Sequence, residues 1–198
     1  RSSFYSDSPE SFAKLTEFGP WREALDQTPG YEHLRRLLQF LQWQKRRRGI
    51  VAERWILKSP QHIHNCDVVL SVFPGAKIVQ THRDPLETIP SWASLCYSLW
   101  QQNSDTADPV VCGTYWDEKM ARGIRRCMQV RDAGNADKFF DVDYRDTARD
   151  PLGVAEGICK FVGWEYTQAA RDAQTAWLAA NRRDQRPPRH VPGPRAAG

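Results

Sequence analysis

Two cations in this sequence stand where short apolar stretches end. Lys58 closes the stretch 54–58, Arg83 follows the stretch 76–82, and each is followed within two residues by a proline. Proline lacks the N–H that a strand needs, and the parallel strands of an α/β sheet end at one edge. We therefore expect Lys58 and Arg83 to converge, within about one nucleotide's length, on a crevice that suits a phosphate or sulfate anion.

The surrounding pattern predicts an α/β fold with a parallel sheet. A further apolar stretch at 138–144 predicts a third strand, and a helical pattern at 61–73 makes 54–82 a βαβ unit. Residues 1–11 are Ser-rich without a structural period, which predicts an irregular start. Other helices are expected as two short segments within 11–26 and at 31–47, 85–101, 114–132, 152–162 and 167–181, with a polar loop at 102–112.

Composition limits the function classes. The chain has 198 residues, enough for one domain with a core, and a formal net charge of +4. Residues 181–198 hold five arginines and one aspartate, so the rest of the chain is neutral, which argues against a nucleic-acid-binding surface. No apolar run reaches membrane-spanning length and the start lacks a signal-peptide pattern, so we expect a soluble, cytoplasmic protein without a membrane partner.

The cysteines favour a reducing compartment. The five cysteines are scattered, odd in number and never at metal-ligand spacing. We therefore expect reduced, buried thiols and no bound metal.

Several short motifs together resemble the sulfotransferase family, in particular its bacterial branch. The resemblance runs from about Tyr31 to His190, most of the chain, and its strongest element is the interval of eight residues between Arg83 and Ser91. The other motifs are Lys58-Ser59-Pro60, Phe73-Pro74, Thr81-His82-Arg83-Asp84-Pro85, Tyr144, Asp150-Pro151 and Phe161-Val162-Gly163.

The resemblance implies a fold, a reaction and a set of cofactor-binding residues. The fold is a three-layer P-loop-NTPase-like α/β fold with a parallel sheet. The reaction moves a sulfuryl group from 3′-phosphoadenosine 5′-phosphosulfate (PAPS) to a hydroxyl or amine of a small-molecule acceptor. In that family an Arg and a Ser at this spacing hold the 3′-phosphate of PAPS, which assigns Arg83 and Ser91 to the cofactor. The resemblance also implies that Tyr144 contacts the adenine and that Arg189 belongs to the cofactor-binding residues.

The residue types at these positions suit sulfuryl transfer. The reaction needs an in-line approach and cations that neutralise charge developing on the leaving oxygen. Lys58 can place a compact charge beside that oxygen, whereas the planar fork of Arg83 matches two phosphate oxygens. Ser91 adds a hydroxyl donor, and the N-terminal turn of its helix adds a dipole that favours an anion.

Each residue also has an explanation that involves no ligand. Lys58 could be a surface lysine, and Tyr144 could be a packed aromatic. Arg83 could pair with Asp84 or Glu87. The combination at this spacing favours the nucleotide site.

The general base is harder to assign. Many members of the family place a histidine two residues after the lysine, where this chain has Pro60. His62, one turn into the helix at 61–73, is the candidate, because an imidazole can take a proton near neutral pH. The alternative is a hydrogen-bonded histidine at the helix start. His64 is expected to point away.

One part of the family pattern is absent from the sequence. No glycine has the neighbourhood of the family's Pro-Arg-Ser-Gly-Thr-Thr turn, whose backbone N–H groups cradle the 5′-phosphosulfate, and no Gly-x-x-x-x-Gly-Lys occurs. We therefore expect a sulfotransferase-like domain over 1–190, shortened at the N-terminus without the first phosphate-loop strand and also at the C-terminus, followed by a flexible tail at 191–198. The alternative to an enzyme is a non-catalytic module that binds adenine nucleotides by the 3′-phosphate, or a degenerate relative. The oligomeric state is left open.

Overall fold

The chain falls into two compact units. The computed structural model describes residues 8–15, 17–52 and 54–182. The first unit comprises the chain up to Ala76 together with Trp92–Ala136, and the second comprises Lys77–Ser91 together with the chain from Asp137 onward.

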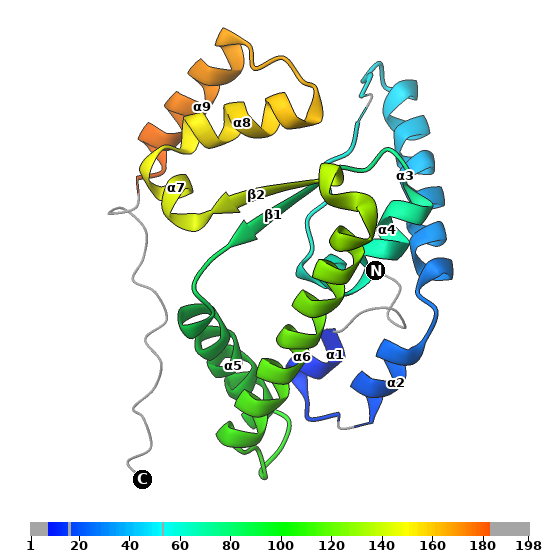
Figure 1. Cartoon of the computed structure of the whole chain (residues 1–198), viewed down its shortest axis with the longest axis vertical. Helices are drawn as coiled ribbons and strands as arrows, with labels where there is room; N and C mark the ends of the chain where they lie inside the picture. The colour runs from blue at the N-terminus through cyan, green and yellow to red at the C-terminus, as the bar shows by residue number, and fades with distance from the viewer. Residues whose placement is uncertain (1–7, 16, 53, 183–198) are drawn as a thin grey trace. The chain divides into compact units, whose positions relative to one another are not determined.

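Most of the described chain is helical (Figure 1). The first unit holds α1 (Ser8–Phe12), α2 (Phe18–Ala24), α3 (Thr28–Arg47), the 3₁₀ helix η2 (Pro60–Asn65), α4 (Cys66–Val72), the second half of α5 (Pro85–Gln101) and α6 (Pro109–Val130). The second unit holds the start of α5 and β1 (Ile78–His82), β2 (Phe139–Asp143), α7 (Tyr144–Arg149), α8 (Pro151–Val162) and α9 (Gln168–Ala180).

The two strands pair in parallel over their whole length. Ile78 lies opposite Phe139 and His82 opposite Asp143, so β1 and β2 end at the same edge. This confirms the parallel pairing expected for 76–82 and 138–144.

The strand expected at 54–58 is not formed. The described residues from 50 to 59 have no regular secondary structure, and the sheet of the described chain has two strands, so the expected βαβ unit is wrong. A strand needs a neighbour to satisfy its backbone groups, and here Ile56 remains 78% exposed. The parallel sheet of the expected α/β fold is present, with two strands within the described residues, in a mostly helical chain.

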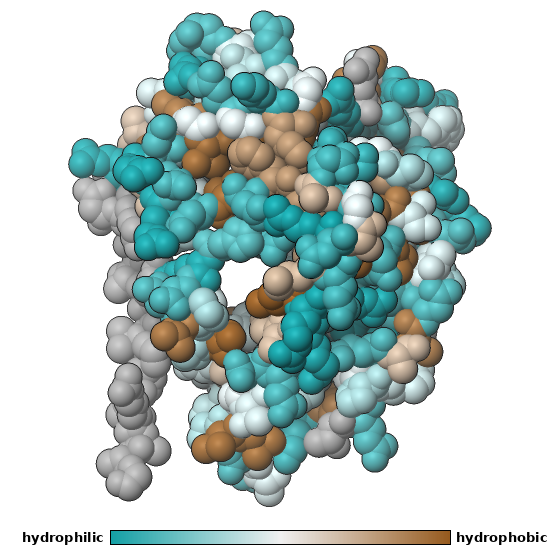
Figure 2. All heavy atoms as spheres, viewed as in Figure 1, coloured by the Kyte–Doolittle hydropathy of each residue, from teal (hydrophilic) through white to brown (hydrophobic). Residues whose placement is uncertain are grey.

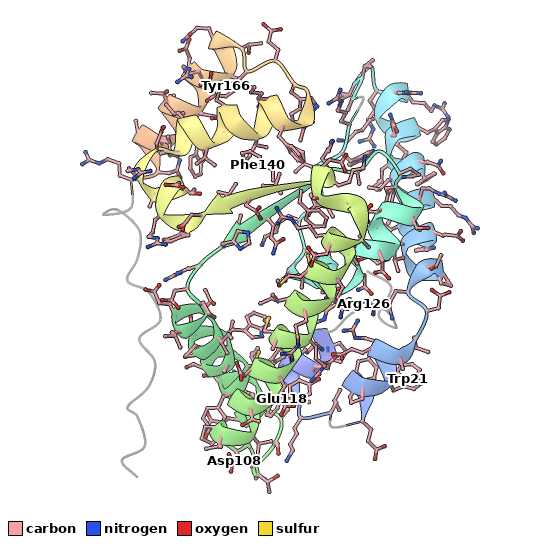
Figure 3. The ribbon with its side chains drawn as sticks, viewed as in Figure 1. Trp21, Asp108, Glu118, Arg126, Phe140 and Tyr166 are labelled. Atoms are coloured by element: carbon pink, nitrogen blue, oxygen red, sulfur yellow. The ribbon has the colours of Figure 1, made fainter. Side chains whose placement is uncertain are left out.

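Most expected helices are confirmed within a few residues, but α6 begins at Pro109 rather than at 114. Asp108, labelled in Figure 3, caps it by accepting the N–H groups of Val110 and Val111 at 2.8 and 3.0 Å. Pro109 suits a first helical turn because it has no N–H to satisfy. The polar loop expected at 102–112 is correspondingly shorter.

The core of the first unit lies between α5 and α6. Cys96 and Trp100 of α5 are buried together with Cys112 and Trp116 of α6. The ring of Trp92 meets that of Trp116 edge-on, with the centroids 5.4 Å apart. Aromatic pairs of this geometry add about 0.5–1.5 kcal/mol beyond the area that they bury.

A buried carboxylate joins the helices of the first unit. Glu10 of α1 is 1% exposed, and its carboxylate accepts hydrogen bonds from Lys119 and Tyr115 of α6. Nε of Arg22 in α2 donates to the same carboxylate at 3.2 Å. The indole N–H of Trp100 in α5 donates to the Glu10 carbonyl at 2.9 Å. Residues 1–11, expected to be irregular, therefore contain a helix that anchors the unit.

These donors keep Glu10 ionised. Burial by itself raises the pKa of Glu10, but the hydrogen bonds from Lys119 and Tyr115 and the nearby positive charges outweigh it and lower the pKa. Gly19 of α2 lies against the Tyr115 hydroxyl, where any Cβ would clash.

The cysteines are free thiols, as expected. Four are buried and Cys159 is half-buried. The thiol of Cys66 donates to Cys127 Sγ at 3.5 Å and so links the start of α4 to α6. This hydrogen bond, together with burial, raises the pKa of the Cys66 thiol.

The second unit packs α8 against the sheet. Phe140 of β2, labelled in Figure 3, stacks on Phe161 of α8 with the ring centroids 5.3 Å apart. Figure 2 shows the apolar surface that gathers between α8 and the strands. Asp150 starts α8 by accepting the N–H of Gly153 at 2.9 Å, and Gly163 ends it with φ 71°.

Replacing Glu10 by Gln should destabilise the first unit strongly. Lys119 and Arg22 would lose their common counter-charge while buried, and breaking a buried pair typically costs about 3–5 kcal/mol. Urea unfolding followed by tryptophan fluorescence measures the loss, because Trp100 and Trp116 lie in this core. The matched control is Glu118→Gln on α6 (Figure 3), where the side chain is 66% exposed and the loss should stay below about 1 kcal/mol. Equal losses would contradict the buried role of Glu10.

A second titrating group of the first unit is His64. Burial lowers its pKa to about 4, against the opposing effect of the Glu23 carboxylate. Its ring lies against Gly123 of α6, where a Cβ would come within 2.6 Å of it. The cations that lower the pKa further are Lys119, Arg22 and Arg122.

The first unit should therefore lose stability in acid. Between pH 6.5 and about 4 the unfolded chain binds a proton at His64 that the folded chain does not, so stability is complete above pH 6.5 and falls as the pH approaches 4. Protonation of Glu10, whose pKa is also lowered, adds to the loss below about pH 4.5. We expect the free energy of unfolding to drop by on the order of 2 kcal/mol between pH 7.5 and 4. His64→Gln should flatten this slope in urea titrations, and a slope unchanged by this substitution would contradict the role of His64.

Candidate functional site

The carboxyl edge of the sheet brings two of the predicted site residues together. Arg83 directly follows β1 and Tyr144 directly follows β2, and the strands end in register. The guanidinium carbon of Arg83 lies 4.7 Å from the centroid of the Tyr144 ring, a cation–π contact. The prediction that Arg83 and the end of the 138–144 strand share one sheet edge is confirmed.

Arg83 is also held by Glu87 in the first turn of α5. Its Nε and Nη2 donate to Oε2 of Glu87 at 3.0 and 2.7 Å. The two side chains are 32% and 60% exposed, so solvent screens the pair and it stabilises the fold only slightly. The pairing with Glu87, which the sequence left open as an alternative to phosphate binding, is present in the structure.

Ser91 lies further along α5 and is exposed. It follows Glu87 by four residues, so the two lie on one face of the helix. Helix α5 begins at Pro85, as expected, so Ser91 lies beyond its first turn. The helix dipole acts mainly within the first turn and therefore contributes little at Ser91.

Other charges at this edge are paired as well. The guanidinium and backbone N–H of Arg145 donate to Asp143, the last residue of β2, and lower the pKa of that carboxyl. Nε2 of His82 lies 2.7 Å from Oδ1 of Asp141. An anion that binds at this edge of the sheet therefore competes with carboxylates for the guanidinium groups of Arg83 and Arg145.

Lys58 lies in the irregular segment before η2 rather than at the end of a strand. Its side chain is exposed, and within the described ranges its ammonium group has no hydrogen-bond or ion-pair partner. The next residue, Ser59, caps η2 by accepting the N–H of Gln61 at 3.4 Å. The ammonium group is therefore open to solvent.

His62 is half-buried in η2. Its Nδ1 lies 2.9 Å from the hydroxyl of Tyr31 in α3. Burial lowers the pKa of His62, so the imidazole is neutral at pH 7, the form that can accept a proton. Burial likewise raises the pKa of Tyr31 and keeps its hydroxyl protonated. Sequence reasoning missed Tyr31 because nothing local marks a partner 31 residues away.

The predicted site residues are divided between the two units. Lys58 and His62 belong to the first unit, whereas Arg83, Ser91 and Tyr144 belong to the second. Arg189 and the tail expected at 191–198 lie outside the described residues.

The described chain contains neither a metal-binding cluster nor a membrane-spanning helix. Among the residues that the structure describes, no group of His, Cys, Asp and Glu side chains could hold a metal ion. Within the same ranges, no helix combines the length and the apolar character that crossing a bilayer requires.

Sequence comparison identifies relatives. The profile of the Sulfotransferase family matches residues 6–168. Two curated relatives, the omega-hydroxy-beta-dihydromenaquinone-9 sulfotransferases Stf3 of Mycobacterium bovis and Mycobacterium tuberculosis, are each 31% identical to the chain over 114 residues. That segment is 54% of this chain and 28% of each relative.

Two solved structures similar to this chain are also sulfotransferases. Sulfotransferase STF9 from Mycobacterium avium matches with a TM-score of 0.81 and 26% identity, over 89% of this chain and 44% of that one. Sulfotransferase STF1 from Mycobacterium tuberculosis matches with a TM-score of 0.73 and 29% identity, over 87% of this chain and 46% of that one. The chain thus spans less than half the length of these relatives. With a family match over most of its residues and the fold of these solved enzymes, the chain belongs to the sulfotransferase family.

Proposed function

We propose that this chain takes part in moving a sulfuryl group from PAPS to a hydroxyl or amine of a small-molecule acceptor. The observation that carries the proposal is the contact between Arg83 and Tyr144 at the carboxyl edge of the parallel sheet. A guanidinium can bind a phosphate through paired hydrogen bonds, and an aromatic ring beside it can stack on a nucleobase. In this role Arg83 and Ser91 bind the 3′-phosphate, Tyr144 contacts the adenine, and Arg189 adds a further cation.

Lys58 is proposed to act on the leaving group. In the reaction a bond forms between the acceptor atom and sulfur, while the bond from sulfur to the bridging oxygen of PAPS breaks and adenosine 3′,5′-bisphosphate leaves. Negative charge grows on that bridging oxygen, and a positioned ammonium group stabilises it. The exposed ammonium of Lys58 has no carboxylate partner within the described ranges, which supports this role.

His62 is proposed to accept the proton that the acceptor loses. Its lowered pKa keeps the ring neutral, and its Nδ1 is engaged with Tyr31. In this role Nδ1 donates to the Tyr31 oxygen, and Nε2 remains as the acceptor.

The acceptor is best sought among hydroxylated molecules first, because the name of the relative Stf3 describes a hydroxylated dihydromenaquinone.

The second candidate function is a non-catalytic module that binds adenine nucleotides by the 3′-phosphate. One feature of the sequence favours this second function: the sequence contains no Pro-Arg-Ser-Gly-Thr-Thr turn to cradle the 5′-phosphosulfate.

The chain should bind adenosine 3′,5′-bisphosphate more tightly than 5′-AMP, because only the former has a 3′-phosphate for Arg83. Arg83→Ala should weaken bisphosphate binding by about 1.5–3 kcal/mol, the usual worth of a charge-assisted hydrogen bond. Isothermal titration calorimetry with both nucleotides measures this difference. The control is Arg171→Ala in the same unit, which should leave both affinities unchanged. Equal affinity for the two nucleotides would exclude a 3′-phosphate pocket.

The 198-residue chain should transfer little sulfate by itself, since the loss of even one preorganised donor costs about 100-fold to 1,000-fold in rate. A polypeptide in which a phosphate-loop segment precedes this chain should be active, and Lys58→Ala should then lower kcat by about 100-fold or more. A transfer assay with radiolabelled PAPS measures both, with Lys160→Ala on the exposed side of α8 as the control. Robust turnover by the 198 residues would refute the need for the loop, and an active Lys58→Ala variant would remove Lys58 from the mechanism.

A further inference from the structure

Glu87 lies midway in the sequence between Arg83 and Ser91, the two residues proposed to hold the 3′-phosphate. Its Oε2 accepts two hydrogen bonds from Arg83, at 3.0 Å from Nε and 2.7 Å from Nη2. Ser91 follows one helical turn later on the same face of α5. The guanidinium also lies against the Tyr144 ring, 4.7 Å from its centroid. The group that a 3′-phosphate would contact is thus already bonded to an anion of the protein.

A phosphate and Glu87 cannot both use Arg83 fully. Nε and Nη2 form one of the two planar edges of the guanidinium that can pair with an oxyanion, and both donate to Glu87 here, so the second edge shares its Nη2 with Glu87. Two anions that share this edge also repel each other, even where water screens them. A phosphate that takes the Nε–Nη2 edge displaces the Glu87 carboxylate, and the 60% exposure of that side chain lets water solvate it when it turns away.

We propose that Glu87 is an intramolecular competitor that limits the affinity of the site for the 3′-phosphate and speeds release of adenosine 3′,5′-bisphosphate. The inference rests on the proposed binding role of Arg83. A carboxylate one turn away in the chain is tethered, so it acts at a high effective concentration. A phosphomonoester displaces it because it carries nearly two negative charges at neutral pH and three acceptor oxygens.

The expected consequence concerns product release. PAPS and adenosine 3′,5′-bisphosphate share the 3′-phosphate, so Glu87 weakens the binding of both equally, and such uniform binding contributes nothing to the chemical step. Product release limits the turnover of many enzymes, and differences in affinity arise mostly in the dissociation rate. Glu87 therefore favours turnover at the expense of affinity.

The second unit offers a closely matched control. Arg171 of α9 pairs with Glu156 of α8, and its guanidinium carbon lies 5.0 Å from the ring centroid of Tyr166, labelled in Figure 3. The side chains of Arg171 and Glu156 are 38% and 56% exposed, close to the values for Arg83 and Glu87. Glu156→Gln therefore removes the same charge from the same kind of arrangement without touching α5.

The test is calorimetric titration of the 198-residue chain and its variants with adenosine 3′,5′-bisphosphate and 5′-AMP. Glu87→Gln keeps the size and the helix propensity of the side chain but removes its charge. It should lower the Kd for the bisphosphate about five- to thirty-fold, through lost competition and lost repulsion, and slow its release in stopped-flow chase experiments. The Kd for 5′-AMP should stay the same, and Glu156→Gln should change neither affinity by more than about two-fold.

Each other outcome counts against the proposal. An unchanged Kd in Glu87→Gln, in a chain that prefers the bisphosphate and loses that preference with Arg83→Ala, would overturn the competitor role and leave the proposed function intact. A similar gain for 5′-AMP, or from Glu156→Gln, would reveal a general charge effect and overturn it as well. If neither the original chain nor Glu87→Gln binds the bisphosphate, the nucleotide site itself is wrong and the competitor role falls with it.

Discussion

The parallel pairing of β1 with β2 is the constraint on which the candidate nucleotide site depends. Because the strands end in register, the residues that follow them, Arg83 and Tyr144, emerge next to each other. Two helices also begin there, α5 capped by Asp84 and α7 capped by Asp143. A slip of one residue between the strands would turn the side chains of one strand to the opposite face and separate these groups. The candidate site therefore depends on the register in which β1 and β2 pair.

In the first unit the corresponding constraint is the buried carboxylate of Glu10. The carboxylate of Glu10 is out of contact with water, which is unfavourable unless its oxygens are satisfied, and three side-chain donors from α2 and α6 satisfy them. Such a network tolerates little displacement, because any lost donor leaves a charge unpaired in a region of low dielectric constant. The same α6 packs against η2, where His62 lies. His62, the proposed general base, thus lies in η2, which packs against α6, and α6 is bonded to the Glu10 carboxylate.

The candidate nucleotide site also illustrates that residue types alone do not define function. A glutamate, an arginine and a tyrosine meet in the same way at Glu156, Arg171 and Tyr166 as they do at the sheet edge. What separates the two sets is their surroundings: Arg83 follows a strand of a parallel sheet and precedes a helix that carries a serine at the right spacing. In our proposal the ion pair at the sheet edge exchanges its carboxylate for a phosphate, whereas the pair between α8 and α9 joins two helices.

Local patterns in the sequence determined a large part of this protein. Apolar periodicity and end signals predicted α5, α8 and α9 and the parallel partners β1 and β2, because a helix or strand is largely specified by residues within a few positions of one another. The pairing of Arg83 with Glu87 was visible for the same reason, as an i,i+4 spacing. Tertiary structure alone decided that 54–58 has no neighbouring strand, that His62 bonds Tyr31, and that Glu10 is buried against Lys119, 109 residues away. These outcomes depend on contacts between distant segments, and no local pattern encodes which distant group a polar side chain will meet.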